Sequence, residues 1–189
     1  MQRFQRFQQY FHLFIRLVSA VIFSFIFSGC VSQSGVDFNK RQAAKARVDV
    51  ALGYLEQSDF TQAKLNLDKA FAYEPDYYLV HAVFAHFYQL QGETQQAEAA
   101  YKKALRLDAK QGNVHNNFGT FLCSHGKFEE AYQEFDQALI SPNYYAQADT
   151  YENIALCALS AGNHDRYEQA LEALEKIDVK RAKKLNWVK

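Results

Sequence analysis

Cysteine and histidine side chains are the residues of this chain best suited to chemistry. The 189-residue sequence contains three cysteines and six histidines. Thiolates and imidazoles can act as nucleophiles, general bases or zinc ligands. The histidines have no metal-ligand spacing to one another, and the sequence contains no phosphate-binding loop, no nucleophile elbow and no HExxH motif. We therefore predict that the chain is not an enzyme and uses no metal, cofactor or small-molecule substrate.

Two of the cysteines, Cys123 and Cys157, lie 34 residues apart in regions with helical periodicity. A disulfide between them would need Cα atoms about 4.4–6.8 Å apart, which helical backbones rarely offer. Free cysteine is also among the most buried residue types. We therefore interpret this pair as two buried thiols, with a disulfide as the alternative.

A 34-residue period organises the part of the chain that must position these side chains. Two alanines, seven positions apart, recur at this period: Ala63 and Ala70, Ala97 and Ala104, Ala131 and Ala138. Small residues at fixed offsets in a 34-residue period are typical of tetratricopeptide repeats, in which each unit is a pair of antiparallel helices. A small residue is needed where two helices cross, because a larger side chain would push the axes apart. The sequence thus predicts an all-α, right-handed superhelix of helix-turn-helix repeats.

Four repeats fit this register, and a short basic segment follows them. The repeats are predicted at residues 44–77, 78–111, 112–145 and 148–181, the last after a two-residue slip. A glycine ends the first helix in three of them: Gly92, Gly126 and Gly162. Tyr167 replaces the small residue in repeat 4, which is common in a terminal capping repeat. Residues 182–189 are predicted as a basic C-terminal cap, with Trp187 covering the core.

The first thirty residues follow a different pattern. Arg3, Arg6 and Arg16 form a basic leader, and residues 17–28 form an apolar run. This run is shorter than the roughly 20 residues that a membrane-spanning helix needs, and its size is typical of a secretory signal peptide. It ends in Phe-Ser-Gly-Cys at positions 27–30, which resembles the lipobox of bacterial lipoproteins.

The lipobox resemblance implies that residues 1–29 are a lipoprotein signal peptide and that Cys30 carries a covalent lipid. Three acyl chains would anchor the protein firmly, because each buried methylene contributes about 0.8 kcal/mol. Val31 follows in place of an aspartate, which implies transfer to the outer membrane, facing the periplasm. Residues 30–43 are then the lipidated cysteine and a flexible tether. The alternatives are an ordinary secreted protein and an uncleaved anchor.

The charge of the chain argues against a nucleic-acid partner. The whole chain carries 21 basic and 21 acidic side chains. The predicted signal peptide contains three of the arginines and no acidic residue, so the mature chain has a net charge of −3. Domains that bind nucleic acid usually carry a basic surface. We therefore predict no nucleic-acid partner, and a membrane contact through the lipid anchor.

The concave face of the superhelix, lined by the first helix of each repeat, is the predicted partner-binding groove. Apolar residues gather in its first half: Val48, Leu52, Leu55, Leu79, Ala82 and Leu90. Such a strip could accept an amphipathic helix, unless neighbouring repeats cover some of these side chains. Further along the groove becomes polar, and Asn116 offers a donor and an acceptor to the backbone of an extended peptide. The alternative role for Asn116 is a capping hydrogen bond or a hydrogen bond between helices.

Four segments of the repeat region resemble one family. Their sequences are Ala-Leu-Gly-Tyr-Leu at 51–55, Asn-Asn-Phe-Gly-Thr-Phe-Leu at 116–122, Phe-Glu-Glu-Ala-Tyr at 128–132 and Tyr-Glu-Asn-Ile-Ala-Leu at 151–156. With the lipoprotein leader, they are similar to the PilF/PilW pilotin family of type IV pilus biogenesis lipoproteins. The resemblance covers about residues 44–175. Members of that family usually have six repeats, whereas this sequence supports four.

This resemblance implies a non-enzymatic scaffold whose partner is the outer-membrane secretin. Such a protein would bind secretin subunits in the periplasm and promote their outer-membrane targeting and multimerisation through the concave groove. The alternative is a tetratricopeptide-repeat lipoprotein that acts as an adaptor for cell-wall or other envelope machinery. Neighbouring pilus genes would favour the first role, and neighbouring murein-enzyme genes would favour the second.

Overall fold

The computed structural model describes residues 39–186. Three predictions lie outside this range: the signal peptide at residues 1–29, the lipidation of Cys30 and the position of Trp187 over the core. Within the described range every secondary-structure element is an α-helix. None of these helices is long and apolar enough to cross a membrane.

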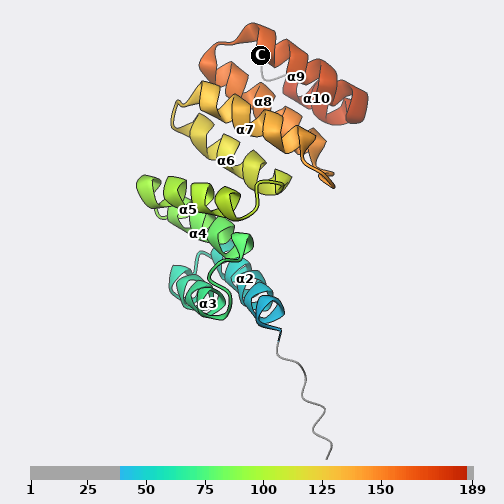
Figure 1. Cartoon of the computed structure of the whole chain (residues 1–189). Helices are drawn as coiled ribbons and strands as arrows, with labels where there is room; N and C mark the ends of the chain where they lie inside the picture. The colour runs from blue at the N-terminus through green and yellow to red at the C-terminus, as the bar shows by residue number, and fades with distance from the viewer. Residues whose placement is uncertain (1–38, 187–189) are drawn as a thin grey trace, which may run out of the picture. The chain divides into compact units, whose positions relative to one another are not determined.

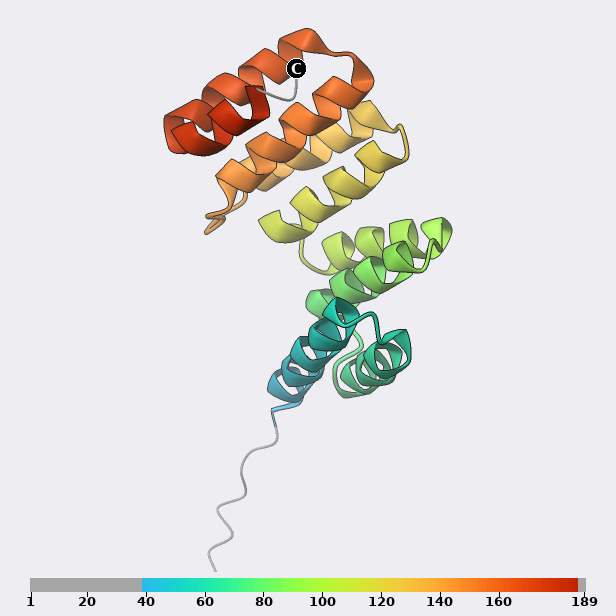
Figure 2. The same ribbon diagram turned by 180° about the vertical axis from the view of Figure 1, so that it is seen from behind.

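Helix pairs follow one another along the described array (Figure 1). The pairs are α2 (Lys40–Glu56) with α3 (Phe60–Tyr73), α4 (Tyr78–Leu90) with α5 (Thr94–Leu107), α6 (Gly112–Ser124) with α7 (Phe128–Ile140), and α8 (Gln147–Ala161) with α9 (His164–Ile177). A last helix, α10 (Val179–Asn186), packs against α9 and α8. Seen from behind, α2 and α3 again lie at one end of the array and α9 and α10 at the other (Figure 2). This stacking confirms the predicted tetratricopeptide-repeat fold.

The turn inside each helix pair contains one residue with a left-handed backbone. These residues are Ser58 (φ 58°), Gly92 (φ 73°), Gly126 (φ 73°) and Gly162 (φ 68°). Glycine adopts this conformation without steric cost, which explains its recurrence where the first helix ends. Their spacings of 34, 34 and 36 residues confirm the predicted register and the two-residue slip before repeat 4.

Small residues lie at the helix crossings, as the repeat pattern predicts. Ala51, Ala63, Ala85 and Ala97 are fully buried. In repeat 3 the space is tighter still, because a Cβ atom on Gly119 would lie 2.7 Å from the Phe135 ring. The close approach of α6 and α7 therefore depends on the missing side chain at this position.

The first helix begins earlier than predicted. α2 starts at Lys40, after Asn39, whose Oδ1 accepts a hydrogen bond from the N–H of Gln42 at 3.1 Å. Asparagine is a preferred residue at this capping position because it satisfies a free backbone donor of the first turn. Residues 40–43, predicted as part of the tether, are therefore helical.

The C-terminal cap is a helix that crosses the predicted boundary between residues 181 and 182. In α10, Ala182 is 3% exposed and Leu185 is 5% exposed, so both belong to the core. Tyr167 of α9 is fully buried, and its hydroxyl donates to the carbonyl oxygen of Leu185 at 3.4 Å. The large residue at the degenerate position of repeat 4 thus serves to hold α10.

Cys123 and Cys157 form a disulfide, with their Cα atoms 5.8 Å apart. The interpretation of this pair as two free thiols is therefore wrong. Their helices, α6 and α8, are the first helices of successive repeats and pack directly against each other. This packing brings the two backbones into bridging range.

Buried side chains form two clusters that meet at α4. The first cluster joins α2, α3 and α4, and the second runs from α4 to α10. Val83 and Phe84 of α4 belong to the first cluster, whereas Ala85 belongs to the second. The array therefore divides into a first half, built on the first cluster, and a second half that contains repeats 3 and 4.

Candidate protein-binding surface

Two of the residues predicted to line the groove lie in the core. Val48 is fully buried and Leu55 is 5% exposed. Both share a stripe of α2 with Ala44 and Ala51, at helical spacing, and this stripe packs against α3 and α4. Val48 and Leu55 are therefore not available to a partner, which corrects this part of the predicted groove.

The other four apolar residues are accessible, and we call them the α2–α4 surface: Leu52, Leu79, Ala82 and Leu90. The first three are partly exposed, and Leu90 is 47% exposed. Leu79, Ala82 and Leu90 follow one side of α4 over three turns, since their spacings of three and eight residues match the helical period. Leu52 comes from α2, which packs against α4, and rests on the same core cluster as Leu79.

The polar residues next to this surface on α4 carry no charge. His86 is half-buried, and burial lowers its pKa, so its imidazole is neutral at neutral pH. The Oε1 atom of Gln89 accepts a hydrogen bond from the hydroxyl of Tyr101 in α5 at 3.0 Å. Burial raises the pKa of Tyr101, which keeps this donor protonated. α4 thus presents an apolar, uncharged face.

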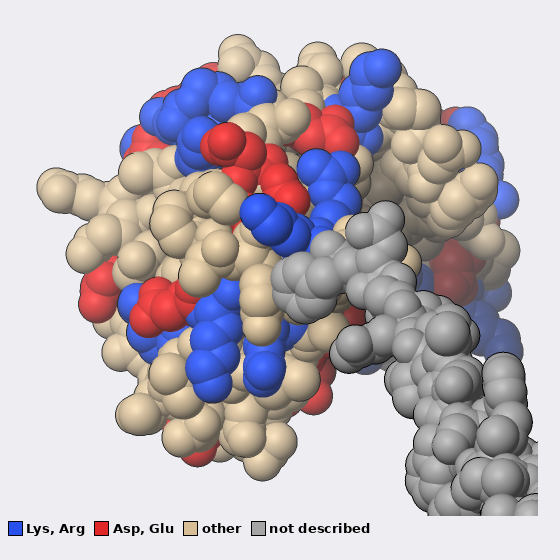
Figure 3. Space-filling view, turned by 60° about the horizontal axis from the view of Figure 1, so that its bottom comes forward, with Lys and Arg blue, Asp and Glu red and all other residues tan. Residues whose placement is uncertain are grey.

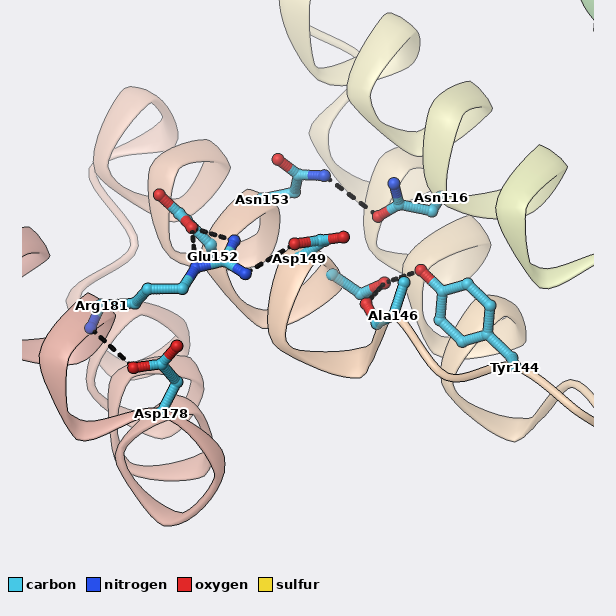
Figure 4. A network of polar contacts seen from close by, with 9 residues as sticks. Asn116, Tyr144, Ala146, Asp149, Glu152, Asn153, Asp178 and Arg181 are labelled. Carbon is cyan, nitrogen blue, oxygen red and sulfur yellow. Dashed lines mark hydrogen bonds and ion pairs between the residues drawn. The ribbon is translucent and has the colours of Figure 1, made fainter.

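The second half of the predicted groove is built from paired polar groups. Asn116 of α6 is 9% exposed, and its Oδ1 accepts a hydrogen bond from Nδ2 of Asn153 in α8 at 3.0 Å (Figure 4). Of the roles predicted for Asn116, the structure shows the hydrogen bond between helices. The Cys123–Cys157 disulfide joins the same two helices, so α6 and α8 are linked at two points.

Arg181 of α10 adds a third link in this region. Its guanidinium donates to Oδ1 of Asp149 at 2.6 Å and to Oε2 of Glu152, both in α8 (Figure 4). These hydrogen bonds, to Asp149 and then to Glu152, raise the pKa of Arg181. Asp178 caps α10, because its carboxylate accepts a hydrogen bond from the backbone N–H of Arg181 at 3.1 Å.

A buried histidine holds the helix pair of repeat 3 to the preceding loop. His115 is 7% exposed; its Nδ1 lies 2.6 Å from Oε2 of Glu134, and its Nε2 lies 3.0 Å from the carbonyl oxygen of Ala109. Burial alone would lower the pKa of His115, but the bonds to Glu134 and Ala109 outweigh it and raise that pKa. His81 contacts the carbonyl oxygen of Pro75 in the same way, at 2.7 Å. Both histidines lie away from the α2–α4 surface.

Charges of both signs are mixed on the outside of the molecule. Figure 3 shows lysine and arginine interspersed with aspartate and glutamate on one face of the described residues. Several of them form exposed ion pairs within one helix, such as Lys64 with Asp68, which contribute little to stability. Within residues 39–186, no group of three or more histidine, cysteine, aspartate or glutamate side chains could hold a metal ion.

Among the contacts of the second half, the disulfide and the inter-helix bond of Asn116 were predicted only as alternatives, and the partner Asn153 and the ion pairs of Arg181 were not predicted. The spacing of the cysteines, equal to one repeat, was a usable signal, because successive repeats stack side by side. No motif assigned a contact to Asn153 or Arg181, because their roles depend on helices that meet only after the array has formed.

Comparison with known proteins places the chain among repeat proteins. Residues 54–116 match a family described as tetratricopeptide repeat. An uncharacterized protein of Haemophilus influenzae is 59% identical over 172 residues, which cover 91% of this chain and 96% of that protein. The type IV pilus assembly protein PilF of Pseudomonas aeruginosa is 32% identical over 154 residues, which cover 79% of this chain and 60% of PilF.

The solved structures agree with this placement. A structure from the functional characterization of P. aeruginosa PilF matches with a TM-score of 0.70 and 30% identity, over 74% of this chain and 63% of that chain. This chain therefore spans less than two thirds of the length of PilF. From its fold, its repeats and these relatives, the chain belongs to one family with the H. influenzae protein and is a tetratricopeptide-repeat protein related to PilF.

Proposed function

We propose that this chain is a non-enzymatic scaffold for type IV pilus biogenesis, which binds the secretin subunit and promotes its outer-membrane targeting and multimerisation. The observation that carries the proposal is the α2–α4 surface, to which α4 contributes an apolar face without charged residues, in a chain related to PilF. Because the chain spans 60% of PilF, the role rests on the part that the two proteins share.

The α2–α4 surface fits the apolar side of an amphipathic helix from the partner. Such helices bind through apolar residues at i, i+3 or i+4, and i+7, and the accessible side chains of α4 follow a similar spacing over three turns. Full burial of a leucine-sized side chain contributes about 1.5–3 kcal/mol. A few such contacts would offset the entropy lost when the partner helix is ordered.

In this proposal, a covalent lipid on Cys30 anchors the protein to the membrane. The lipobox-like residues at positions 27–30 support it, and so does the disulfide between Cys123 and Cys157. Disulfides persist in oxidising compartments such as the bacterial periplasm and are rare in the cytosol. The scaffold would then stand on the outer membrane, facing the periplasm, where the secretin subunits arrive.

Deletion of the gene tests the proposal. Membranes from the wild type, the deletion strain and a strain complemented with Cys30→Ala are separated into inner and outer fractions. The fractions are run unboiled on a gel and blotted for the secretin. We expect secretin multimers in the outer membrane of the wild type, and monomers or inner-membrane multimers in the other two strains. Wild-type complementation must restore the pattern.

Two results would count against the proposal. If the deletion strain keeps its outer-membrane multimers, the chain is not a secretin scaffold, and the envelope adaptor becomes the working hypothesis. If the deletion abolishes the multimers but Cys30→Ala restores them fully, the scaffold role stands and the lipid anchor is not required for it.

A further inference from the structure

A pocket of about 300 Å³ lies between α3 and α5, the second helices of repeats 1 and 2, and reaches α4; we call it the α3–α5 pocket. Its lining residues are Lys64, Asp68 and Phe71 of α3, His81, Phe84 and Tyr88 of α4, and Ala100 of α5. The three residues of α4 lie about half a turn from the side chains that α4 gives to the α2–α4 surface, because a helix has roughly 3.6 residues per turn. The pocket and the α2–α4 surface are therefore on different sides of α4.

The rings of the pocket form one cluster. Phe71 meets His81 and Phe84 edge to face, with ring centroids 5.9 Å and 6.5 Å apart. Phe84 stacks on Tyr88 at a centroid distance of 5.9 Å. Phe71 is 44% exposed, so the cluster is open to solvent on this side. Aromatic rings attract cations to their faces, where the quadrupole is negative.

A cation of the chain itself already lies at this cluster. Nζ of Lys64 is 5.6 Å from the centroid of Phe84 and 2.5 Å from Oδ1 of Asp68. Both members of this ion pair are largely exposed, so the lysine can leave the ring at little cost. The α3–α5 pocket thus combines ring faces with a carboxylate, which together suit a positively charged group.

An equivalent pocket lies between α7 and α9, the second helices of repeats 3 and 4. Allowing for the two-residue slip, four of its lining residues lie two repeats after four residues of the α3–α5 pocket: Asp136, Leu139, Ile154 and Ala170 correspond to Asp68, Phe71, Phe84 and Ala100. The two pockets are therefore the same feature of the repeat, with different contents.

An arginine of the chain crosses the pocket between α7 and α9. Cζ of Arg166 lies 5.1 Å from the ring centroid of Tyr132, and Nη2 donates to Oδ1 of Asp136 at 2.6 Å. Arg166 directly precedes Tyr167, and the residue that precedes the equivalent Ala97 is Gln96. Among the described residues, Asp68 pairs only with Lys64 of its own helix. The α3–α5 pocket therefore has the acid and the rings but no arginine from the next repeat.

We propose that the α3–α5 pocket binds the side chain of an exposed arginine on a protein partner. The guanidinium takes the place of the Lys64 ammonium over Phe84 and donates to Asp68, as Arg166 donates to Asp136. Arginine is preferred to lysine because its planar group stacks on rings and is more weakly hydrated. An arginine within a chain is preferred to free arginine, because Asp68 is the only acid of the lining and no second acid can pair with a free α-ammonium group.

NMR titration of the isotope-labelled full chain in detergent tests the site without assuming a partner. The main probe is Nα-acetylarginine methylamide. The comparison probes are the citrulline equivalent, which has a similar shape without the charge, the lysine equivalent and free arginine. Shifts of the backbone amides locate each probe and give its dissociation constant. This test does not depend on the proposed role in secretin assembly.

Three variants separate the pocket from general surface charge. Asp68→Asn removes the acid, and Lys64→Met removes the competing cation but keeps an apolar side chain. Asp49→Asn is the matched control, because Lys45 and Asp49 form an exposed pair of the same spacing in α2. All three substitutions are at largely exposed side chains, and the spectrum of each variant reports whether the fold is retained.

We expect saturable shifts in the α3–α5 pocket with the blocked arginine, and about threefold weaker binding of the other three probes. Asp68→Asn should weaken binding of the blocked arginine about threefold, Lys64→Met should strengthen it by about the same factor, and Asp49→Asn should leave it unchanged. The proposal is overturned if the blocked arginine gives no saturable shifts in the pocket, if the citrulline or lysine probe binds as tightly, or if Asp68→Asn binds like Asp49→Asn. Tighter binding of free arginine would show a small-molecule site and would also overturn it.

Discussion

The two halves of the array use the first helix of each repeat for different purposes. In the first half, α2 and α4 leave leucine and alanine side chains partly exposed. In the second half, α6 and α8 are joined by a disulfide and an asparagine pair, and α8 is joined to α10 by ion pairs. The first helices therefore provide a surface in one half and cross-links in the other. Under the proposed function, repeats 1 and 2 would carry the partner contact and repeats 3 and 4 would support them.

The largest expected effect comes from removing the disulfide. The bridge closes a loop between residues 34 positions apart, and restriction of the unfolded chain by a loop of this length is worth about 3–4 kcal/mol. Cys123→Ser with Cys157→Ser should lower the free energy of unfolding by about this amount in urea titrations. Reductant should destabilise the wild type similarly and leave the double variant unchanged. Equal midpoints for all samples would show that the bridge does not stabilise the second half.

A smaller effect is expected from filling the tightest helix crossing. In Gly119→Ala the new methyl group would lie 2.7 Å from the Phe135 ring and 3.1 Å from the carbonyl oxygen of Ala131. Overpacking of this kind costs about 1–3 kcal/mol. Thermal and urea unfolding should both show the loss. An unchanged stability would mean that α6 and α7 can separate without penalty, against the picture of a rigid second half.

The His115–Glu134 pair predicts a pH dependence that belongs to the second half. The pKa of His115 is raised in the folded state, so its contribution is fully present below the unfolded value of about 6.5 and is lost as the pH rises through the folded value. Glu134→Gln should therefore cost about 1.5 kcal/mol at pH 5.5 and much less at pH 9. Urea titrations at both values check this. Parallel pH profiles for the wild type and the variant would contradict it.

The smallest effect has the opposite sign and lies in the first half. Gly53 is inside α2, and a Cβ atom there would meet no atom within 4 Å. Gly53→Ala should stabilise the chain by about 0.5–1 kcal/mol, because alanine loses less backbone entropy in a helix. Paired with Gly119→Ala, it separates the effect of helix propensity from that of packing. Destabilisation by Gly53→Ala would show that α2 is more closely packed than its exposed positions suggest.

The fold could be predicted from the sequence because the repeat constrains it locally. Glycines and alanines at fixed offsets determine where helices end and cross, and the left-handed residues at Gly92, Gly126 and Gly162 lie where the pattern placed them. The two-residue slip before repeat 4 could also be predicted, because Gly162 lies 36 residues after Gly126 and the repeat period is 34 residues. The helix ends, the crossing within each helix pair and the turns depend only on residues within one repeat.

The candidate site was predicted only in part, because exposure depends on how repeats stack. Val48 and Leu55 occupy positions that face a groove in an average repeat, but in repeat 1 their stripe packs against α3 and α4. The disulfide was only the alternative prediction, because the two Cα atoms come within bridging range only through the contact of α6 with α8. The contacts of Arg181 with Asp149 and Glu152 were not predicted, because they depend on the packing of α10 against α8.

The most direct test of the account compares two pairs of glutamate substitutions in the complemented deletion strain. Leu79→Glu with Leu90→Glu places charge on the α2–α4 surface, and Ser124→Glu with Ser160→Glu places the same charge on exposed positions of α6 and α8. Melting temperatures of the purified chains establish that both variants fold. The account predicts that the first pair abolishes outer-membrane secretin multimers on an unboiled gel and that the second pair retains them. Multimers that persist with the first pair, in a folded chain, would contradict it.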